Sequence, residues 1–394
     1  MWKEIVQEQV KEVMDQIMKD RHHLHAHPEL SFQEVETAAY IRQQLDDLGV
    51  PWETCTDNGT VALVSGKLPS EQVTGLRADI DALPILEENQ IPYRSLHDGV
   101  MHACGHDVHT SCLLGVIRVL VRLKEKFAGT VKCVFQPAEE KFPGGAAAMV
   151  ATGALENPRP SFMLAQHVMP ELEAGKIGIR EGLYAASNDE VYISVLGKGG
   201  HGSQPDALID PVSIAAQLIV SLQQIVSRKA NPIIPTVLSF GKIIANGATN
   251  IIPDNVYIEG TLRTFDPEWR KEAHQLIEQT AQGIAKALGA RCEVKIQGFP
   301  NVYNDPAYTK QIREWAIEFL GKENVVDLPL WMAGEDFGEF TVDTPGCYYR
   351  TGTGNKQQGI TAPLHNACFN VDEKPTLEVG TSLMTFLTLK TLGN

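Results

Sequence analysis

The order of predicted strands and helices changes near Ala185 and again near Gly298, and this change constrains the fold more than any other feature. Between these points the chain reads strand, helix, strand, strand, helix, strand, which is the order of a ferredoxin-like module. The strands are expected at Glu190–Leu196, Thr236–Ile243, Val256–Phe265 and Arg291–Gln297, and the helices at Pro211–Arg228 and Pro267–Leu288. This order of elements predicts that the middle of the chain folds as a module with its own sheet.

Before Ala185 the chain alternates between strands and helices. Residues 1–49 are expected to be helical, with Pro28 as the single breaker. Later strands are expected at Thr60–Ser65, Val73–Ile80, Thr130–Gln136 and Ser161–His167, and helices at Asp107–Lys126 and Gly144–Leu155. Such alternation predicts a largely parallel sheet covered by helices.

The segment after Gly298 has too few predicted strands for a sheet of its own, so we expect it to complete the first domain. The predicted fold is therefore α/β, with a helix-covered mixed sheet and an inserted ferredoxin-like satellite domain. The expected boundaries are 1–185 and 298–394 for the first domain and 186–297 for the satellite.

Composition excludes several classes of protein. The chain has 34 basic and 49 acidic side chains, for a net charge of −15, and an acidic surface repels nucleic acid. Its start lacks a secretory signal, and no apolar run approaches the roughly 20 residues of a membrane span. The seven cysteines are scattered and form no Cys-x-x-Cys pair, which argues against a disulfide framework and for a reducing compartment. We expect a cytoplasmic protein with no nucleic-acid or membrane partner.

Side chains of the kind that bind metals gather in four places. The stretches are Met101–Thr110 before a predicted helix, Gln136–Glu140 and Gln166–Pro170 at the ends of predicted strands, and Pro363–Cys368 in the returning segment. Ligand sites in open α/β sheets gather at the carboxyl ends of strands, so the first three groups are expected at one edge of the sheet.

One thiolate, three imidazoles and a carboxylate suit zinc and related cations. Five such groups exceed one tetrahedral site, so two metals that share ligands are the simpler interpretation. Glu139 and Glu140 follow the end of a strand, so their adjacent side chains are expected to point in different directions. One of them can then bind metal while the other holds a proton.

Each of these groups also has an ordinary structural interpretation. A single cysteine before a helix usually packs, paired glutamates usually face solvent, and a histidine at a strand end usually makes structural hydrogen bonds. The coincidence of four groups favours the metal site. Asp107 is expected to cap the helix that it starts. The other cysteines (55, 112, 133, 292, 347 and 368) are expected to pack, and His22, His23, His25 and His274 to be surface or structural residues.

At these residues the chain resembles the amidohydrolase branch of the M20 metallopeptidase family, and the resemblance covers nearly the whole sequence. That branch contains N-acyl-amino-acid amidohydrolases, hippurate hydrolases and auxin-conjugate hydrolases. The matching motifs are Leu24–Ser31, Leu76–Pro84, Met101–Thr110, Gln136–Glu140, Gly199–Pro205, Met332–Phe337 and Leu364–Asn366.

The resemblance implies roles for individual residues. It implies that the metal ligands are Cys104, His106, Glu140, His167 and His365. Two divalent metal ions per subunit are expected, and the soft sulfur favours zinc while mixed nitrogen and oxygen ligands would accept manganese, cobalt or nickel. The resemblance makes Glu139 the general base and then the acid. In the satellite it implies that His201 stabilises the oxyanion, often in the partner subunit's site. It also implies that Asn250 and Arg263 bind the substrate carboxylate. Family satellites often dimerise and move as lids.

The chain departs from the wider family at Arg77. Many members carry a metal-binding histidine two residues before an aspartate, where this chain has Arg77 and Asp79. Arginine cannot ligate a cation, so the site must use Cys104 and His106. Asp79 either orients a ligand or merely ends a strand.

The expected activity is hydrolysis of an N-acyl-L-amino acid to a carboxylic acid and a free amino acid. The expected assembly is a homodimer or higher homo-oligomer. A metallo-dipeptidase or aminopeptidase of the same family is the main alternative, and it would need a free amino terminus on its substrate. Two rivals come from other classes: a non-catalytic amino-acid-binding protein, and a thiol hydrolase with Cys104 as nucleophile and His106 or His109 as base.

Overall fold

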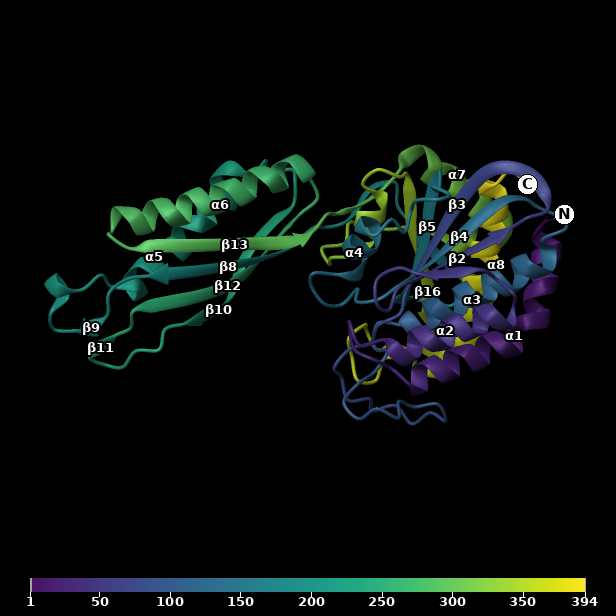
Figure 1. The fold of residues 1–394 in the computed structure, drawn as a ribbon, viewed down its shortest axis with the longest axis horizontal. Helices are drawn as coiled ribbons and strands as arrows, with labels where there is room; N and C mark the ends of the chain where they lie inside the picture. Colours follow the sequence, from purple (N-terminus) through teal and green to yellow (C-terminus); the bar gives the residue numbers. More distant parts are fainter. Residues whose placement is uncertain (1, 394) are drawn as a thin grey trace. The chain divides into compact units, whose positions relative to one another are not determined.

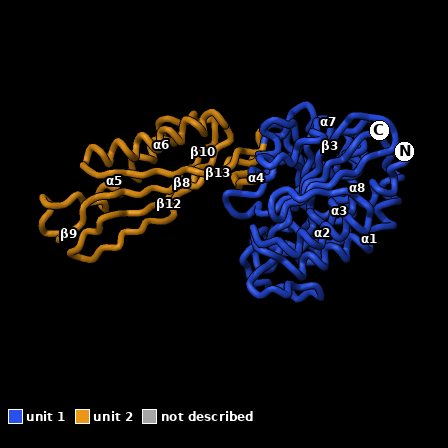
Figure 2. Tube along the Cα trace, in the orientation of Figure 1, with its two compact units in different colours: residues 1–182, 303–329, 336–394 blue, residues 183–302, 330–335 orange. Residues whose placement is uncertain are grey.

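A computed structural model describes residues 2–393 of the chain. These residues form two compact units, shown in different colours in Figure 2. The first unit contains the chain up to Gly182, Tyr303–Pro329 and the chain from Asp336 onward, and the second contains Leu183–Val302 and Leu330–Glu335. Among the described residues, no helix has the length and apolar character needed to cross a membrane.

The first unit is built on an eight-stranded mixed sheet. In spatial order its strands are β1 (Trp52–Thr54), β2 (Thr60–Ser65), β4 (Ala128–Gln136), β3 (Leu68–Asp79), β5 (Phe162–Glu173), β16 (Gly346–Gly354), β6 (Ile177–Ile179) and β15 (Val325–Asp327). The central strands β4, β3, β5 and β16 are mutually parallel, whereas β1, β2 and β4 pair antiparallel. The predicted mixed sheet is confirmed, and β16 of the returning segment pairs with β5 at its centre.

Helices pack around this sheet. They are α1 (Trp2–Ala26), α2 (Val35–Asp47), α3 (His106–Leu123), α4 (Gly145–Ala151), α7 (Pro306–Leu320) and α8 (Glu373–Thr391). Helix α3 is buried along nearly its whole length because it packs against α1, α8 and the sheet (Figure 1). The expected helical stretch over residues 1–49 is interrupted around Pro28, since proline disfavours the helical conformation of the residue before it.

The second unit has the predicted ferredoxin-like order. It contains β8 (Asn188–Leu196), α5 (Pro211–Gln224), β10 (Thr236–Ile244), β12 (Asn255–Thr264), α6 (Pro267–Ala287) and β13 (Arg291–Phe299). The four strands form an antiparallel sheet in the order β13-β8-β12-β10, and α5 and α6 cover one face of it (Figure 1). Alternate residues of β8, such as Val191 and Ile193, are buried under the helices. The predicted fold class is therefore confirmed.

Short elements complete the two units. The strands β9 (Gly200–His201) and β11 (Ile251–Ile252) pair with each other, as do β7 (Gly182–Ala185) and β14 (Val302–Asn304). The aspartates before α5 and α6, Asp210 and Asp266, accept backbone hydrogen bonds in the first turn of each helix. A proline follows each cap, so the sequence specifies where both helices begin.

A core substitution should destabilise the second unit. Leu218 on α5 is fully buried, so Leu218→Ala removes packed atoms and leaves a cavity. We expect the free energy of unfolding to fall by about 2–5 kcal/mol, measured by urea denaturation. The control Leu288→Ala removes a side chain that is 45% exposed. Equal losses from both variants would contradict the predicted packing.

Candidate metal site

Three of the four predicted groups meet beside the neighbouring strands β3, β4 and β5, and His167 lies within β5 (Phe162–Glu173) and not at the strand end where it was expected. Strand β3 ends at Asp79, β4 ends at Gln136 just before the glutamate pair, and β5 carries His167. Gly105 has a φ of 80° and stands at the N-cap of α3, which places Cys104 before the helix and His106 at its first residue. The fourth group joins them because the His365 N–H donates a hydrogen bond to the Ala103 carbonyl at 2.8 Å.

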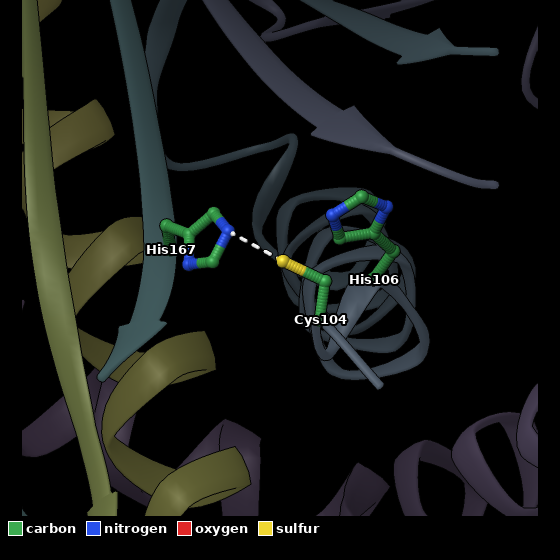
Figure 3. Close-up of side chains that lie close together, drawn as sticks. All are labelled: Cys104, His106 and His167. Carbon is green, nitrogen blue, oxygen red and sulfur yellow. Dashed lines mark hydrogen bonds between the residues drawn. The ribbon is translucent and has the colours of Figure 1, made fainter. Parts of the chain in front are cut away.

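Cys104, His106 and His167 converge in the interior of the first unit (Figure 3). All three are buried, and their potential ligand atoms lie within 4.8 Å of one another. His167 points from β5 toward the sulfur, with Nε2 at 3.4 Å from Cys104 Sγ. Its Nδ1 lies 2.8 Å from the Val168 carbonyl, which can only accept a hydrogen bond, so Nδ1 carries the proton. Nε2 therefore presents its lone pair, as a metal ligand must.

Asp81 determines the orientation of His106. The Nδ1 of His106 lies 3.1 Å from Asp81 Oδ1, while the buried Nε2 has no hydrogen-bond partner among residues 2–393. A carboxylate on one ring nitrogen that leaves the other free is the usual arrangement behind a metal-binding histidine. Burial lowers the pKa of His106, but Asp79, Asp81 and Glu140 outweigh this effect and raise it to about 10. The surroundings of His106 therefore attract positive charge.

Glu140 and His365 extend the cluster. Glu140 Oε1 lies 3.2 Å from His365 Nε2 and 3.8 Å from His106 Nε2. Cys104, Glu140 and His365 form a second set whose ligand atoms lie within 4.8 Å, and His106, Glu139 and Glu140 form a third. The structure thus brings together all five predicted ligands and the predicted base.

His109 is near this cluster but both of its ring nitrogens are engaged. The Val168 N–H donates to Nε2 at 2.9 Å, so Nδ1 carries the proton and donates it to Asp79 Oδ1 at 2.5 Å. Burial lowers the pKa of His109 more than Asp79 raises it, which favours the neutral ring. His109 therefore has no lone pair left for a metal in this arrangement.

Arg77 occupies a buried polar network. Its guanidinium donates to Asp79 Oδ2 at 2.7 Å, to Gln136 Oε1 at 2.8 Å and to Asp336 Oδ1 at 3.1 Å. Arg77 and His109 together hold Asp79 beside His106, with 3.7 Å between Asp79 Oδ2 and His106 Nε2. Of the two interpretations of Asp79, this geometry favours an orienting role over a simple strand end.

The other predicted residues belong to the second unit. The exposed His201 in β9 pairs with Ile251 in β11, and its Nδ1 lies 2.7 Å from Ser203 Oγ. The carbonyl of Asn250 accepts a hydrogen bond from Gly202 at 2.9 Å, so His201 and Asn250 lie on the same ribbon. Arg263 is half-buried near the end of β12, where its Nε donates to Thr261 Oγ1.

Comparison with known proteins decides the family. Residues 75–389 match the model of Peptidase family M20/M25/M40. The chain belongs to this family. It is 40% identical over 374 residues to a putative amidohydrolase of Bacillus subtilis, with 94% of each chain covered. It is 42% identical over 306 residues to an N-acyl-L-amino acid amidohydrolase of Geobacillus stearothermophilus, with 76% of this chain and 82% of the relative covered.

A solved structure agrees with this assignment. The crystal structure of a dinuclear metal-binding M20 peptidase from Bacillus subtilis has a TM-score of 0.82 to this chain at 34% identity, covering 97% of this chain and 99% of that one. This M20 protein is therefore a metal-dependent enzyme that hydrolyses amide bonds, and its ligand cluster suits divalent cations.

Two expectations about this M20 enzyme were wrong. Asp107 does not cap α3, because its carboxylate accepts hydrogen bonds from Arg21 Nε at 3.1 Å and His25 Nδ1 at 2.9 Å. Cys368 is exposed instead of packed. The buried His25 is structural, as expected, since it bridges Asp107 and Glu87.

The sequence reasoning missed Asp81 as a site residue. Its Oδ2 accepts hydrogen bonds from Ser31 Oγ at 2.7 Å and from the Glu140 N–H at 2.9 Å, while Oδ1 faces His106. Asp81 thus orients two predicted ligands. The available signal was its place in the motif Leu76–Pro84, together with Ser31 in the motif Leu24–Ser31.

Asp81→Asn should weaken metal binding. The amide offers one acceptor where the carboxylate offers two, so His106 and the Glu140 backbone cannot both be held as before. We expect metal affinity to fall by about 10- to 100-fold, measured by competition with a chromogenic chelator. Asp57→Asn, which changes an exposed carboxylate of the same unit, is the control. Equal affinities for Asp81→Asn and wild type would refute the orienting role.

Proposed function

We propose that this enzyme hydrolyses N-acyl-L-amino acids to a carboxylic acid and a free amino acid. The observation that carries the proposal is the convergence of Cys104, His106, His167, Glu140 and His365 beside Glu139. The similarity to an N-acyl-L-amino acid amidohydrolase supports the substrate class. The metallo-dipeptidase or aminopeptidase of the same family remains the alternative to test.

The ligand set fits two divalent cations. Five donors exceed one tetrahedral site. His106 Nε2 is buried without a hydrogen-bond partner in the described part of the chain, and His167 Nε2 presents its lone pair to the same space. When bound, such cations polarise the substrate carbonyl and lower the pKa of a bound water to about 7. A thiolate among the ligands favours zinc, while mixed imidazole and carboxylate ligands also accept manganese, cobalt or nickel.

Glu139 supplies the proton transfers. Its carboxylate lies within 4.8 Å of the ligand atoms of His106 and Glu140, which is where an attacking water would be held. Glu139 takes a proton from this water and then delivers it to the leaving nitrogen of the amide. His201 is proposed to stabilise the negative charge on the carbonyl oxygen, and a well-placed donor of this kind contributes about 3–4 kcal/mol.

The geometry around Cys104 argues against a thiol hydrolase. The imidazole nitrogen within hydrogen-bond distance of Cys104 Sγ is Nε2 of His167, whereas the rival mechanism named His106 or His109 as the base. His109 uses both of its ring nitrogens in other hydrogen bonds, so it has no lone pair with which to deprotonate the thiol. Burial and the nearby Glu140 raise the pKa of the Cys104 thiol, which disfavours a free nucleophilic thiolate.

The second unit supports the proposed homodimer. The ribbon of β9 and β11, with His201 and Asn250, extends beyond the end of the sheet where β12 begins (Figure 1). Arg263 follows Asn255 by eight residues, or about 26 Å at ~3.3 Å per residue of strand. A small substrate cannot span that distance, so a shared site would need Arg263 and His201 from different chains.

Strand β10 offers an edge for such a dimer. Within residues 2–393 it pairs with β12 alone, and it carries the exposed Ile243 and Ile244. Exposed apolar edge strands are usually covered, and a symmetric pair of copies would cover this one. We propose that the second unit forms the dimer and acts as a lid over the metal site, which lies in the first unit.

Ile243→Lys should therefore give a monomer. The added charge opposes burial of the β10 edge, and loss of the partner's His201 would lower kcat by about 10²-fold. Light scattering after size-exclusion chromatography measures the mass, and turnover is assayed on the same fractions. Val342→Lys, which changes an exposed apolar side chain of the first unit, is the control. A monomer with full turnover would refute a catalytic role for the dimer.

The substrate proposal is tested by a hydrolysis screen. Apoprotein is reloaded with each of zinc, manganese, cobalt and nickel, and then assayed on N-acyl amino acids and on dipeptides with free amino termini. We expect turnover of N-acyl amino acids to exceed that of the dipeptides. The reverse preference would favour the peptidase alternative, and no turnover with any cation would refute the proposed function.

A further inference from the structure

The backbone before Glu139 adopts a conformation that its sequence does not favour. Ala138 is fully buried and has a φ of 53°, in the left-handed region that residues other than glycine rarely adopt. Such a conformation persists only when its surroundings hold it, and it is common near active sites. The left-handed conformation of Ala138 therefore requires neighbouring groups that hold it.

The side chain of Glu34 holds the Ala138 backbone in this conformation. Its Oε1 accepts a hydrogen bond from the Ala138 N–H at 2.7 Å, and its Oε2 accepts one from Asn58 Nδ2 at 3.0 Å. The carbonyl of Ala138 in turn accepts from the Gly145 N–H at 3.0 Å. Glu34 is fully buried, so these contacts are shielded from water. Both polar groups of the Ala138 backbone are thus paired.

A second carboxylate, that of Asp81, binds the backbone on the C-terminal side of Glu139. Asp81 Oδ2 accepts from the Glu140 N–H at 2.9 Å. The backbone N–H groups that flank Glu139 are therefore each bound by a buried carboxylate, Ala138 by Glu34 and Glu140 by Asp81. This pairing fixes the direction in which the intervening side chain leaves the backbone.

The position of Glu34 in the chain is that of a helix cap, but its carboxylate does not serve as one. Glu34 immediately precedes α2, yet its side chain does not cap that helix. Glu29 binds the helix start instead, because its carboxylate accepts from the Thr37 N–H at 2.7 Å and the Glu36 N–H at 3.2 Å. The sequence motif around Glu29 and Ser31 thus continues into a residue directed at the turn before Glu139.

We propose that Glu34 is a positioning residue that holds the Ala138 turn and thereby aims Glu139 at the reacting water. The inference rests on the proposed function, because it takes Glu139 to be the general base. It predicts that loss of Glu34 lowers kcat while KM and the number of bound metal ions stay unchanged. A displaced base slows proton transfer but leaves the metal ligands in place.

The test compares Glu34→Ala with the double variant Glu34→Gln plus Asn58→Asp. In the double variant the glutamine oxygen can accept from Ala138 and its amide can donate to the aspartate, so both hydrogen bonds are rebuilt. Hydrogen exchange of the peptide 137–145 is measured by mass spectrometry in the metal-loaded enzyme, alongside kcat, KM and metal content. Glu29→Ala is the matched control, since it removes a carboxylate from the same segment that does not contact the turn.

For Glu34→Ala we expect faster exchange in 137–145 and a fall in kcat of about 10- to 100-fold. The double variant should restore both, and Glu29→Ala should change neither. Unchanged exchange in Glu34→Ala, no recovery in the double variant, or the same losses in Glu29→Ala would each overturn the inference. A wild-type protein that hydrolyses no N-acyl amino acid would refute the proposed function instead, and exchange alone would then decide whether Glu34 holds the turn.

Discussion

Glu139→Gln is expected to fold and to bind its metal ions while losing almost all turnover. Glutamine has nearly the shape of glutamate but cannot accept and return a proton, so both proton transfers lose their carrier. General acid–base catalysis contributes about 10²- to 10⁴-fold to rate, and we expect kcat to fall by that amount. KM should change little, because the amide keeps the size of the side chain beside His106 and Glu140.

The control for this prediction is Glu53→Gln, which neutralises an exposed carboxylate on β1 of the same unit. It should leave kcat and metal content unchanged. Metal content is measured by atomic emission on the same samples, so that lost turnover is not confused with lost metal. Retained activity in Glu139→Gln would remove Glu139 from the mechanism, whereas lost metal would make it a ligand.

Removal of divalent cations is expected to lower turnover by a comparable factor. Cations in such sites stabilise the transition state by several kcal/mol, and each factor of ten in rate corresponds to about 1.4 kcal/mol. Exhaustive treatment with EDTA should therefore lower turnover by about 10³-fold or more, and reloading with a divalent cation should restore it. The measurement is initial velocity on an N-acyl amino acid before chelation, after it and after reloading.

Chelation also separates the metal mechanism from the thiol mechanism. A thiol hydrolase that uses Cys104 would keep its turnover in EDTA, and that result would contradict the proposed ligand role. Dialysis against buffer without EDTA is the control for losses during handling. Iodoacetamide gives a second comparison, because a ligated and buried Cys104 should react more slowly in the metal-loaded enzyme than in the apoprotein.

The strand and helix order could be predicted because each element has a local signal. Asp210–Pro211 and Asp266–Pro267 mark the starts of α5 and α6, and the alternation of buried residues in β8 is visible in its sequence. The ligand candidates were also visible, since cysteine, histidine and paired glutamates stand at predicted strand ends. The expected cap at Asp107 failed because a long-range partner, Arg21, binds that carboxylate instead.

The sequence by itself determined which side chains could bind metal and which elements would carry them, because spacing and residue type are local properties. Only the tertiary structure decided how those side chains are held. Asp81 meets His106 and Glu140, and Glu34 meets Ala138 across 104 positions of the chain, through contacts that no local pattern encodes. The physical reason is that a hydrogen bond depends on ångström-scale placement, which is set by the packing of β3, β4 and α3 around one core.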